Sequence, residues 1–424
     1  MLKRVGCMII SIILLITSTG CGDSSETDDN IYAVTVGIDK GSYNKVIVTV
    51  QYPTYKGGTP GGGASQGGGS ENNVHSIEAP GVIEGINLLN MAISRKVSLK
   101  HIKLLVISEK IARQGVAQYV APFSRYREPR RAMAVVITKD NAVSFIKENK
   151  SNIGTSITKS IELMETQSNT TGFFPDTKFY EFYEGIFGNY GQGIATYAGV
   201  NNFSNLLLRD IGQNPPVVIN PNYSPGDLPR IGVTKREFVG TAVFNGDKMV
   251  GSLNPWETRY LLLITGKFDR GIFAVYDKLG DENKIVSFEL KLARNPKIKG
   301  KFENNKPVIN IDLYLEGEIT GIQSRINYAN IHLIENLNSQ IENYLEKDII
   351  KTINKTQKKY KADVFNFGEQ FAGYFPTIQE WEKYNWLKHY EEAKINLSVK
   401  VDLRRTGIRT RTSRIFSNQG ESER

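Results

Sequence analysis

The N-terminal leader constrains this chain more than any other segment, because it decides the compartment in which the rest folds. Lys3 and Arg4 precede an apolar run at residues 8–16, and small or polar residues 17–20 follow. This order is typical of a secretory signal peptide. The run is too short for a transmembrane helix, which needs about 20 apolar residues. We therefore expect residues 1–20 to be a signal peptide that is removed on export.

The residue after this leader, Cys21, resembles the modified cysteine in the lipobox of bacterial prolipoproteins. Thr19 and Gly20 fit that motif, whereas Ser18 stands where leucine is usual. The resemblance implies a diacylglyceryl group on Cys21, so that lipid anchors the protein to a membrane without a spanning helix. The alternative is an ordinary signal peptide in which Cys21 has no special role.

Cysteine use limits the chemistry of the mature chain. Its two cysteines are Cys7, in the leader, and Cys21, at the lipidation position. The mature chain would then have no free thiol and no disulfide, which excludes a thiol enzyme, a cysteine-ligated zinc site and a redox motif. The fold must depend on its hydrophobic core, and the length is sufficient for two or three domains.

The charge of the chain restricts its partners. The formal net charge is +9, and removal of Lys3 and Arg4 with the leader leaves +7. A positive charge favours a protein held against anionic lipid. Nucleic-acid binding would need the same sign, but export argues against a nucleic-acid partner.

Hydrophobic periodicity predicts an α+β or mixed α/β fold, with mixed sheets flanked by helices in two regions or three sub-domains. In the first half we expect strands at 31–39, 46–52, 102–107 and 132–137, and helices at 82–93, 109–120, 141–147 and 179–187. In the second half we expect a hairpin at 238–252 with an Asn-Gly turn, strands at 285–292, 308–317 and 395–403, and a helix at 331–353. The apolar run 260–264 fits a buried strand or helix.

Composition also predicts the domain boundaries. Residues 21–30 form a polar, acidic tether, and residues 211–230 form a linker containing prolines 215, 216, 221, 225 and 229. They delimit an N-terminal region at 31–210 and a C-terminal region at 231–407. A flexible Gly-rich loop interrupts the first region at 57–69, and a basic, polar tail follows the second at 408–424.

Motifs for catalysis are weak in this sequence. Ser65 lies in a Gly-x-Ser-x-Gly string, but the string falls inside the glycine tract and lacks the strand and helix that a nucleophile elbow needs. The histidines, at 75, 101, 332 and 389, have no metal-ligand spacing. We therefore predict a protein that is not an enzyme and has no catalytic residues, cofactor or metal.

Two groups of arginines are candidate contact sites. Arg125, Arg127, Arg130 and Arg131 crowd one connection before a predicted strand, and the C-terminal group comprises residues 404, 405, 409, 411 and 414. Either group would suit lipid headgroups or an acidic partner protein. The alternative is that both are merely solvated.

Several strings along the chain together form a recognisable pattern. The most specific is 240–251 with Leu253 and residues 257–259. The others are 36–40, 46–51, 94–96, 101–107, 109–115, 361–365 with Gly368, Trp381 with Trp386, and 404–407. In this order they resemble the Ger(x)C lipoproteins, the C subunits of the nutrient germinant receptors of spore-forming bacteria. Two departures are Gly22-Asp23, where members often carry Trp-Asp after the lipidated cysteine, and the glycine tract, which resembles an inserted loop.

The resemblance implies a non-enzymatic subunit, anchored to the outer face of the spore inner membrane. Its partners would be integral-membrane A and B type subunits, and the complex would respond to nutrients by releasing ions and dipicolinic acid. Two alternatives remain. One is a solute-binding or envelope-assembly lipoprotein with no role in germination, and the other is a hydrolase that uses Ser65.

Overall fold

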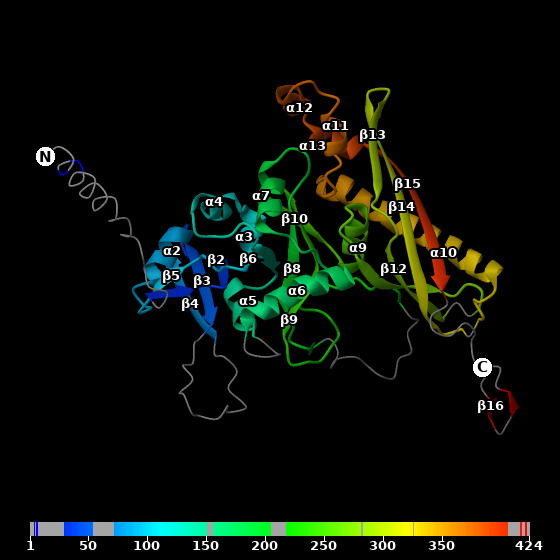
Figure 1. Ribbon diagram of the computed structural model, residues 1–424, viewed down its shortest axis with the longest axis horizontal. Coiled ribbons are helices and arrows are strands. Elements are labelled where there is room, and N and C mark those ends of the chain that lie inside the picture. The colour runs from blue at the N-terminus through cyan, green and yellow to red at the C-terminus, as the bar shows by residue number, and fades with distance from the viewer. Residues whose placement is uncertain are drawn as a thin grey trace.

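The computed structural model describes residues 29–53, 72–150, 156–204, 218–280, 283–324 and 326–405, with residues 4, 6, 416–417 and 420–421. These residues build two large β-sheets that lie one after the other along the long axis of the molecule (Figure 1). Cys21, Ser65 and the glycine tract lie outside the described residues, as do arginines 409, 411 and 414.

The first sheet has eight strands in the order β10-β9-β8-β7-β6-β2-β3-β4. Strands β2, β6, β7 and β8 are parallel neighbours, and antiparallel pairs extend the sheet at both edges. Its strands are β2 (Thr35–Lys40), β3 (Val46–Pro53), β4 (Asn72–Ala79), β6 (Leu104–Ser108), β7 (Ala134–Thr138), β8 (Ile194–Val200), β9 (Arg236–Asn245) and β10 (Lys248–Leu253).

Helices cover both faces of this sheet, which explains why its central strands are continuous apolar runs. One face packs against α2 (Val82–Leu89), α3 (Glu109–Gln114), α4 (Ala117–Arg125) and α7 (Phe179–Phe187). The other packs against α5 (Ala142–Lys147) and α6 (Ile157–Thr171). All five residues of β6 and all five of β7 are buried.

A short parallel pair lies beside the first sheet. Strand β1 (Asn30–Tyr32) pairs with β5 (Lys96–Ser98), and Asn30 lies opposite Lys96. Elements α2, β4 and β5 are at one end of the molecule, and α10 and β15 are at the other (Figure 1).

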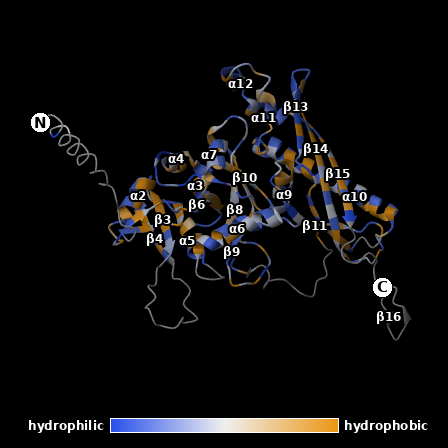
Figure 2. Ribbon diagram, in the orientation of Figure 1, coloured by the Kyte–Doolittle hydropathy of each residue, from blue (hydrophilic) through white to orange (hydrophobic). Residues whose placement is uncertain are grey.

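The second sheet is built on the 17-residue strand β14 (Lys306–Ile322). Strands β12 (Ile285–Leu292) and β13 (Lys297–Glu303) pair antiparallel with successive parts of it, and β11 (Arg270–Tyr276) continues the sheet beyond β12. Strand β15 (Lys394–Arg405) pairs with β14 in parallel. Hydrophobic and hydrophilic residues alternate along β14 and β15 (Figure 2), as expected for a sheet with one covered face.

Two helices bury the covered face of the second sheet. Helix α10 (Ile331–Asn354) contributes a stripe of Leu337, Ile341, Leu345 and Ile349, which belongs to the same core as the strands. Helix α9 (Pro255–Ile264) lies between the two sheets and begins with a complete cap. The Asn254 side chain accepts from the N–H groups of Trp256 and Glu257, and Glu257 accepts from the Asn254 N–H.

Short elements complete the second half. The chain leaves α10 through a π-helical segment (Lys355–Tyr360), passes α11 (Glu369–Ala372), α12 (Ile378–Tyr384), α13 (Trp386–His389) and a 3₁₀ turn (Tyr390–Glu392), and then enters β15. Beyond β15 the structure describes the small pair β16 (Phe416–Ser417) and β17 (Gly420–Glu421).

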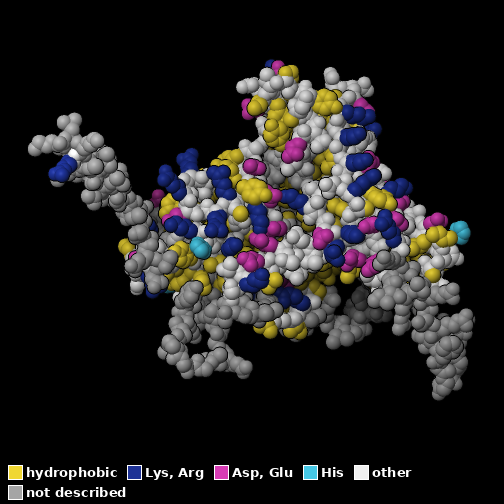
Figure 3. Space-filling model, in the orientation of Figure 1, with side chains coloured by type: hydrophobic (Ala, Val, Ile, Leu, Met, Phe, Trp, Pro, Cys, Tyr) yellow, Lys and Arg dark blue, Asp and Glu magenta, His cyan; other side chains and the backbone are white. Residues whose placement is uncertain are grey.

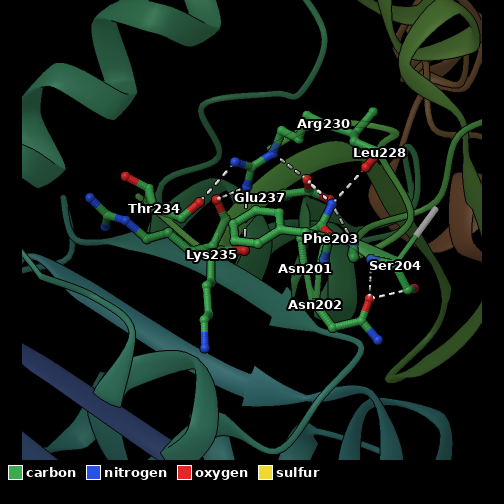
Figure 4. Close-up of polar contacts among 11 residues, drawn as sticks. Asn201, Asn202, Phe203, Ser204, Leu228, Arg230, Thr234, Lys235 and Glu237 are labelled. Atoms are coloured by element: carbon green, nitrogen blue, oxygen red, sulfur yellow. Dashed lines mark hydrogen bonds and ion pairs between the residues drawn. The ribbon is translucent and has the colours of Figure 1, made fainter. Parts of the chain in front are cut away.

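A buried carboxylate holds the Pro-rich connection from β8 to β9 against the first sheet (Figure 4). Glu237, on β9, accepts from Arg230 Nε at 2.6 Å, from Asn201 Nδ2 at 2.6 Å and from the Gly226 N–H at 2.9 Å. The Arg230 guanidinium also lies 5.2 Å from the centre of the Phe203 ring. The described part of the Pro-rich segment is therefore held against the sheet.

The structure confirms the predicted fold class of mixed sheets flanked by helices. The prediction of one helix at 109–120 is wrong, because Gly115 adopts φ +129° and separates α3 from α4. The apolar run 260–264 is the end of helix α9. The first sheet takes β9 and β10 from beyond the Pro-rich segment, and the predicted division at 211–230 stays a prediction.

Candidate contact surface

The four arginines predicted as a contact site lie on the surface. Arg125 is the last residue of α4, and Arg127, Arg130 and Arg131 belong to the connection from α4 to β7. All four residues are exposed. No ion pair joins them to a carboxylate of the residues that the structure describes. Their charges are therefore free to act on something outside the chain.

Glu128 holds this connection in place. Its Oε2 atom accepts a hydrogen bond from the Leu99 N–H at 2.7 Å and one from the Ser98 hydroxyl at 3.2 Å. Ser98 ends β5, so the arginine connection is joined to the segment that pairs with β1. The single carboxylate among these arginines thus binds backbone and hydroxyl donors and forms no ion pair with them.

The structure adds three cations that the sequence interpretation missed. Arg95, Lys96 and Lys100 are exposed and lie within a few residues of Ser98. We call these three and the four arginines the basic surface. Residues 91–104 contain no Asp or Glu, and Glu128 is the single acid of residues 125–133. Figure 3 shows Lys and Arg side chains gathered over α4, at the end that carries α2 and β5.

The basic surface lies beside the first strand, β1. The backbone N–H of Ala33 donates to the Ser98 carbonyl at 2.9 Å, and the Tyr32 and His101 rings are 4.5 Å apart. On its other side the surface borders α7, because the Tyr180 N–H donates to the Arg131 carbonyl. There Glu181 is paired with Lys267 at 2.7 Å.

The C-terminal arginine group is brought into the structure only at its start. Arg404 lies in β15 and pairs with Glu316 at 2.7 Å and with Asp402 at 3.1 Å. The Lys291 ammonium, 2.9 Å from Glu316, lowers the pKa of that carboxyl below its usual range. Arg404 lowers it further. Arg404 therefore belongs to a surface ion-pair network of the second sheet.

The four histidines of the sequence contact separate partners. His75 lies against Tyr52, His101 against Tyr32, His389 against Tyr384, and His332 is 3.8 Å from Glu335. Among the described residues, no three His, Cys, Asp or Glu side chains are grouped to hold a metal ion. Within the same ranges, no helix has the length and apolarity needed to cross a membrane.

One buried carboxylate orders the segment after α10 at the point where this segment contacts the first half of the chain. Asp363 accepts from the Trp386 indole N–H at 2.8 Å and from the backbone N–H groups of Phe365 and Gly368 at 3.1 Å. Complete burial raises its pKa to about 6, although these donors oppose the shift. Its backbone carbonyl accepts from the Gln192 N–H at 2.7 Å, across the joint. A Cβ on Gly368 would collide with the Tyr190 carbonyl.

A cleft of about 900 Å³ also lies at this contact between the first and second halves of the chain. Its wall includes residues of α7, the end of α9, and residues 364–367, 369 and 370. Lys178 there pairs with Glu165 at 2.5 Å and with Asp176 at 3.1 Å. Burial raises the pKa of Asp176 and outweighs the opposing effect of the Lys178 ammonium. The ionic groups of this cleft are thus largely paired with one another.

Both halves of the chain match known protein families. Residues 23–200 match the spore germination protein N-terminal domain, and residues 239–407 match the family described as spore germination B3/GerAC like, C-terminal. The structural comparison finds the crystal structure of the GerBC protein at 18% identity, with a TM-score of 0.49 and coverage of 87% of this chain and 96% of that one.

Curated relatives match over nearly their full length. Spore germination protein YndF of Bacillus subtilis (strain 168) is 25% identical over 430 residues, which cover 96% of this chain and 97% of YndF. Spore germination protein KC of the same strain is 25% identical over 424 residues, covering 95% of each chain. With two family matches that follow one another along the sequence, the chain belongs to the Ger(x)C family of spore germination proteins.

Proposed function

We propose that this chain is the lipid-anchored, non-enzymatic C subunit of a germinant receptor and that it takes part in nutrient-triggered germination. The observation that carries the proposal is the match to spore germination proteins over almost the whole chain. The lipid would be attached to Cys21, nine residues before the first strand. The subunit would lie on the outer face of the spore inner membrane, with integral-membrane A and B type subunits as partners.

The kinds of contact in the described residues suit a structural or relay subunit. Asp363, Glu237 and Arg259 are buried polar groups, and each binds backbone or side-chain groups of more than one segment. Such networks give a rigid body that can transmit a displacement or hold a complex together. Assembly or signal relay is therefore the role that we assign to this subunit.

The test is release of dipicolinic acid from spores that lack this protein, challenged with amino acids, sugars and bile-salt-like germinants in turn. We expect the response to one nutrient class to be lost, while a non-nutrient trigger still works. Restoring the gene should restore that response. Intact responses to every nutrient, after sibling receptors have also been deleted, would contradict a germination role.

A second candidate function, solute binding by an envelope lipoprotein, is favoured by the cleft between the halves. Clefts at such joints are common ligand sites. Titration calorimetry of the purified chain with a panel of small solutes, read together with the spore assay, separates the two candidates. Tight binding of one compound combined with intact nutrient responses would support the second candidate, whereas no binding combined with a lost response would favour a subunit that acts through its partners.

A further inference from the structure

The basic surface and the first strand lie together, and this fixes how far the surface can be from the membrane. Asn30 pairs with Lys96 across β1 and β5, and Cys21 is nine residues earlier. Nine residues reach at most about 30 Å when fully extended. A lipid on Cys21 therefore keeps Lys96 within that distance of the bilayer, and the tether allows direct contact.

The positive charge of the basic surface is complementary to anionic lipid headgroups. Seven exposed cations, at 95, 96, 100, 125, 127, 130 and 131, stand in two segments whose one carboxylate, Glu128, is bound to backbone and hydroxyl donors. Charge attraction to a membrane acts over a Debye length of about 8 Å at physiological salt. A lipid anchor that keeps this surface close to the membrane would bring its charges within the range of that attraction.

Two apolar side chains stand in the same segments. Met91 is 78% exposed and Tyr126 is 39% exposed. The turn that carries Met91 is held by Asn90, whose side chain accepts from the Val97 N–H at 2.8 Å. Tyrosine is enriched at membrane–water interfaces, where its ring meets the headgroup level. Exposed apolar groups among cations are therefore expected of a surface that rests on lipid.

The geometry points to anionic lipid headgroups as the ligand of the basic surface, with the end of the molecule that carries β1, β5 and α4 facing the bilayer. This inference rests on the proposed function for the lipid on Cys21. It orients the subunit: α10 and β15, at the opposite end, would extend away from the membrane (Figure 1). The acidic tether, with Asp23, Glu26, Asp28 and Asp29, is the competing occupant of the surface.

A second basic stripe on the molecule supplies a matched control. Lys297, Lys299 and Lys301 are exposed along β13. They carry as many charges as Arg127, Arg130 and Arg131, but they lie on the second sheet, remote from β1. Figure 3 shows Lys and Arg side chains in a column beside β13 and β14. A general effect of net charge would depend on both sets equally.

The experiment uses the mature chain, residues 21–424, with Cys21→Ala, so that neither the lipid nor the apolar leader contributes. Binding is measured by co-sedimentation with vesicles of phosphatidylcholine alone, or of equal parts phosphatidylcholine and phosphatidylglycerol. We expect binding to the anionic vesicles alone, and its loss at about 0.5 M NaCl, where charges are screened. Each cation near an anionic surface strengthens binding about five-fold. The variant Arg127→Gln/Arg130→Gln/Arg131→Gln should therefore bind roughly 100-fold more weakly.

The controls decide between charge, fold and competitor. Arg127→Lys/Arg130→Lys/Arg131→Lys should keep binding, and Lys297→Gln/Lys299→Gln/Lys301→Gln should change it little. Circular dichroism melting checks that all variants fold. Equal binding to neutral vesicles, or equal losses in the two glutamine variants, would overturn the inference. So would binding that appears only after the four tether acids are changed to amides, because the tether would then cover the surface.

The vesicle assay and the germination assay can fail separately. The vesicle assay requires neither Cys21 nor germination, so it can fail while spores still need the protein. Conversely, vesicle binding would persist if deletion of the gene left every nutrient response intact.

Discussion

The two sheets of this molecule differ in how they meet solvent. Strands β6 and β7 of the first sheet are buried along their full length between two layers of helices. Strands β11 and β13 of the second sheet alternate between buried or half-buried and exposed residues, with helices on one face. The difference shows that the half next to the tether is a closed platform, whereas the other half presents an open sheet face.

The basic surface and the lysines of β13 belong to different sheets. The basic surface is formed by connections of the closed sheet, and Glu128 fixes their backbone. The lysines of β13 lie on an edge strand, where charged side chains hinder pairing with another chain. Similar charge thus has two physical explanations, contact with a ligand and protection of an edge.

The largest predicted effect comes from breaking the closed sheet. Leu105, on β6, is fully buried, and Leu105→Ala should lower the free energy of unfolding by about 3–5 kcal/mol. Ile272, on β11, is 55% exposed, and Ile272→Ala should cost no more than about 0.5 kcal/mol. Urea unfolding of both variants measures the difference, and equal losses would contradict the comparison of the two sheets.

The second prediction concerns Asp363, whose carboxylate orders residues 363–368 and whose backbone carbonyl accepts from the Gln192 N–H near the first sheet. Its pKa is about 6 in the folded protein, compared with an ordinary value of 3.8. A raised pKa means that the folded state binds the proton more tightly, so this contribution is complete below pH 3.8 and is lost as pH rises through 6. The shift corresponds to about 3 kcal/mol.

The difference between wild type and Asp363→Asn isolates this effect from other carboxylates. The free energy of unfolding of wild type, minus that of the variant, should be larger at pH 4 than at pH 7 by up to about 3 kcal/mol. Tryptophan fluorescence is a suitable signal, because Trp386 contacts Asp363. A difference that does not change with pH, or that grows toward pH 7, would refute this assignment.

Arg259 tests how the open sheet is attached to the closed one. It is 2% exposed and donates to the Thr171 carbonyl of α6 at 2.8 Å and the Ile272 carbonyl of β11 at 2.6 Å. Its guanidinium lies 3.9 Å from the centre of the Phe173 ring. Arg259→Ala should cost about 2 kcal/mol, since two partly buried carbonyls lose a charged donor. Arg259→Lys keeps the charge without the planar fork and should cost less.

The smallest effect is expected at an exposed ion pair between α7 and the segment that follows α9. Lys267 pairs with Glu181 at 2.7 Å, but their side chains are 54% and 28% exposed. Lys267→Ala should therefore change the free energy of unfolding by less than about 1 kcal/mol. If Lys267→Ala lowered the free energy of unfolding as much as Arg259→Ala, the contact between the two sheets would depend mainly on surface charge.

Much of the fold could be predicted because hydrophobic periodicity reports burial directly. The continuous runs at β6 and β7 and the long stripe of α10 were identifiable for this reason. Helix α6 was missed, since its buried stripe of Ile157, Ile161 and Met164 is diluted by Ser, Thr and Asn. Strand β13 was missed because lysines and a glycine leave it few apolar residues.

The candidate site was predictable only in part. The four arginines stand close in sequence, so their clustering was visible. Lys96 and Lys100 join them through hydrogen bonds from Ser98 and Leu99 to Glu128, about thirty residues away in the chain. No local pattern encodes that tertiary contact. The absence of acids from residues 91–104 was the one sequence signal that could have suggested it.

The central claim, a receptor subunit held by lipid on Cys21, is tested most directly in spores that carry Cys21→Ala. Membranes are isolated and washed at about 0.5 M NaCl, which screens any contribution of the basic surface. We expect the variant to leave the membrane fraction and dipicolinic acid release to its nutrient to be impaired, while a non-nutrient trigger still works. Retention in washed membranes together with a normal nutrient response would contradict it.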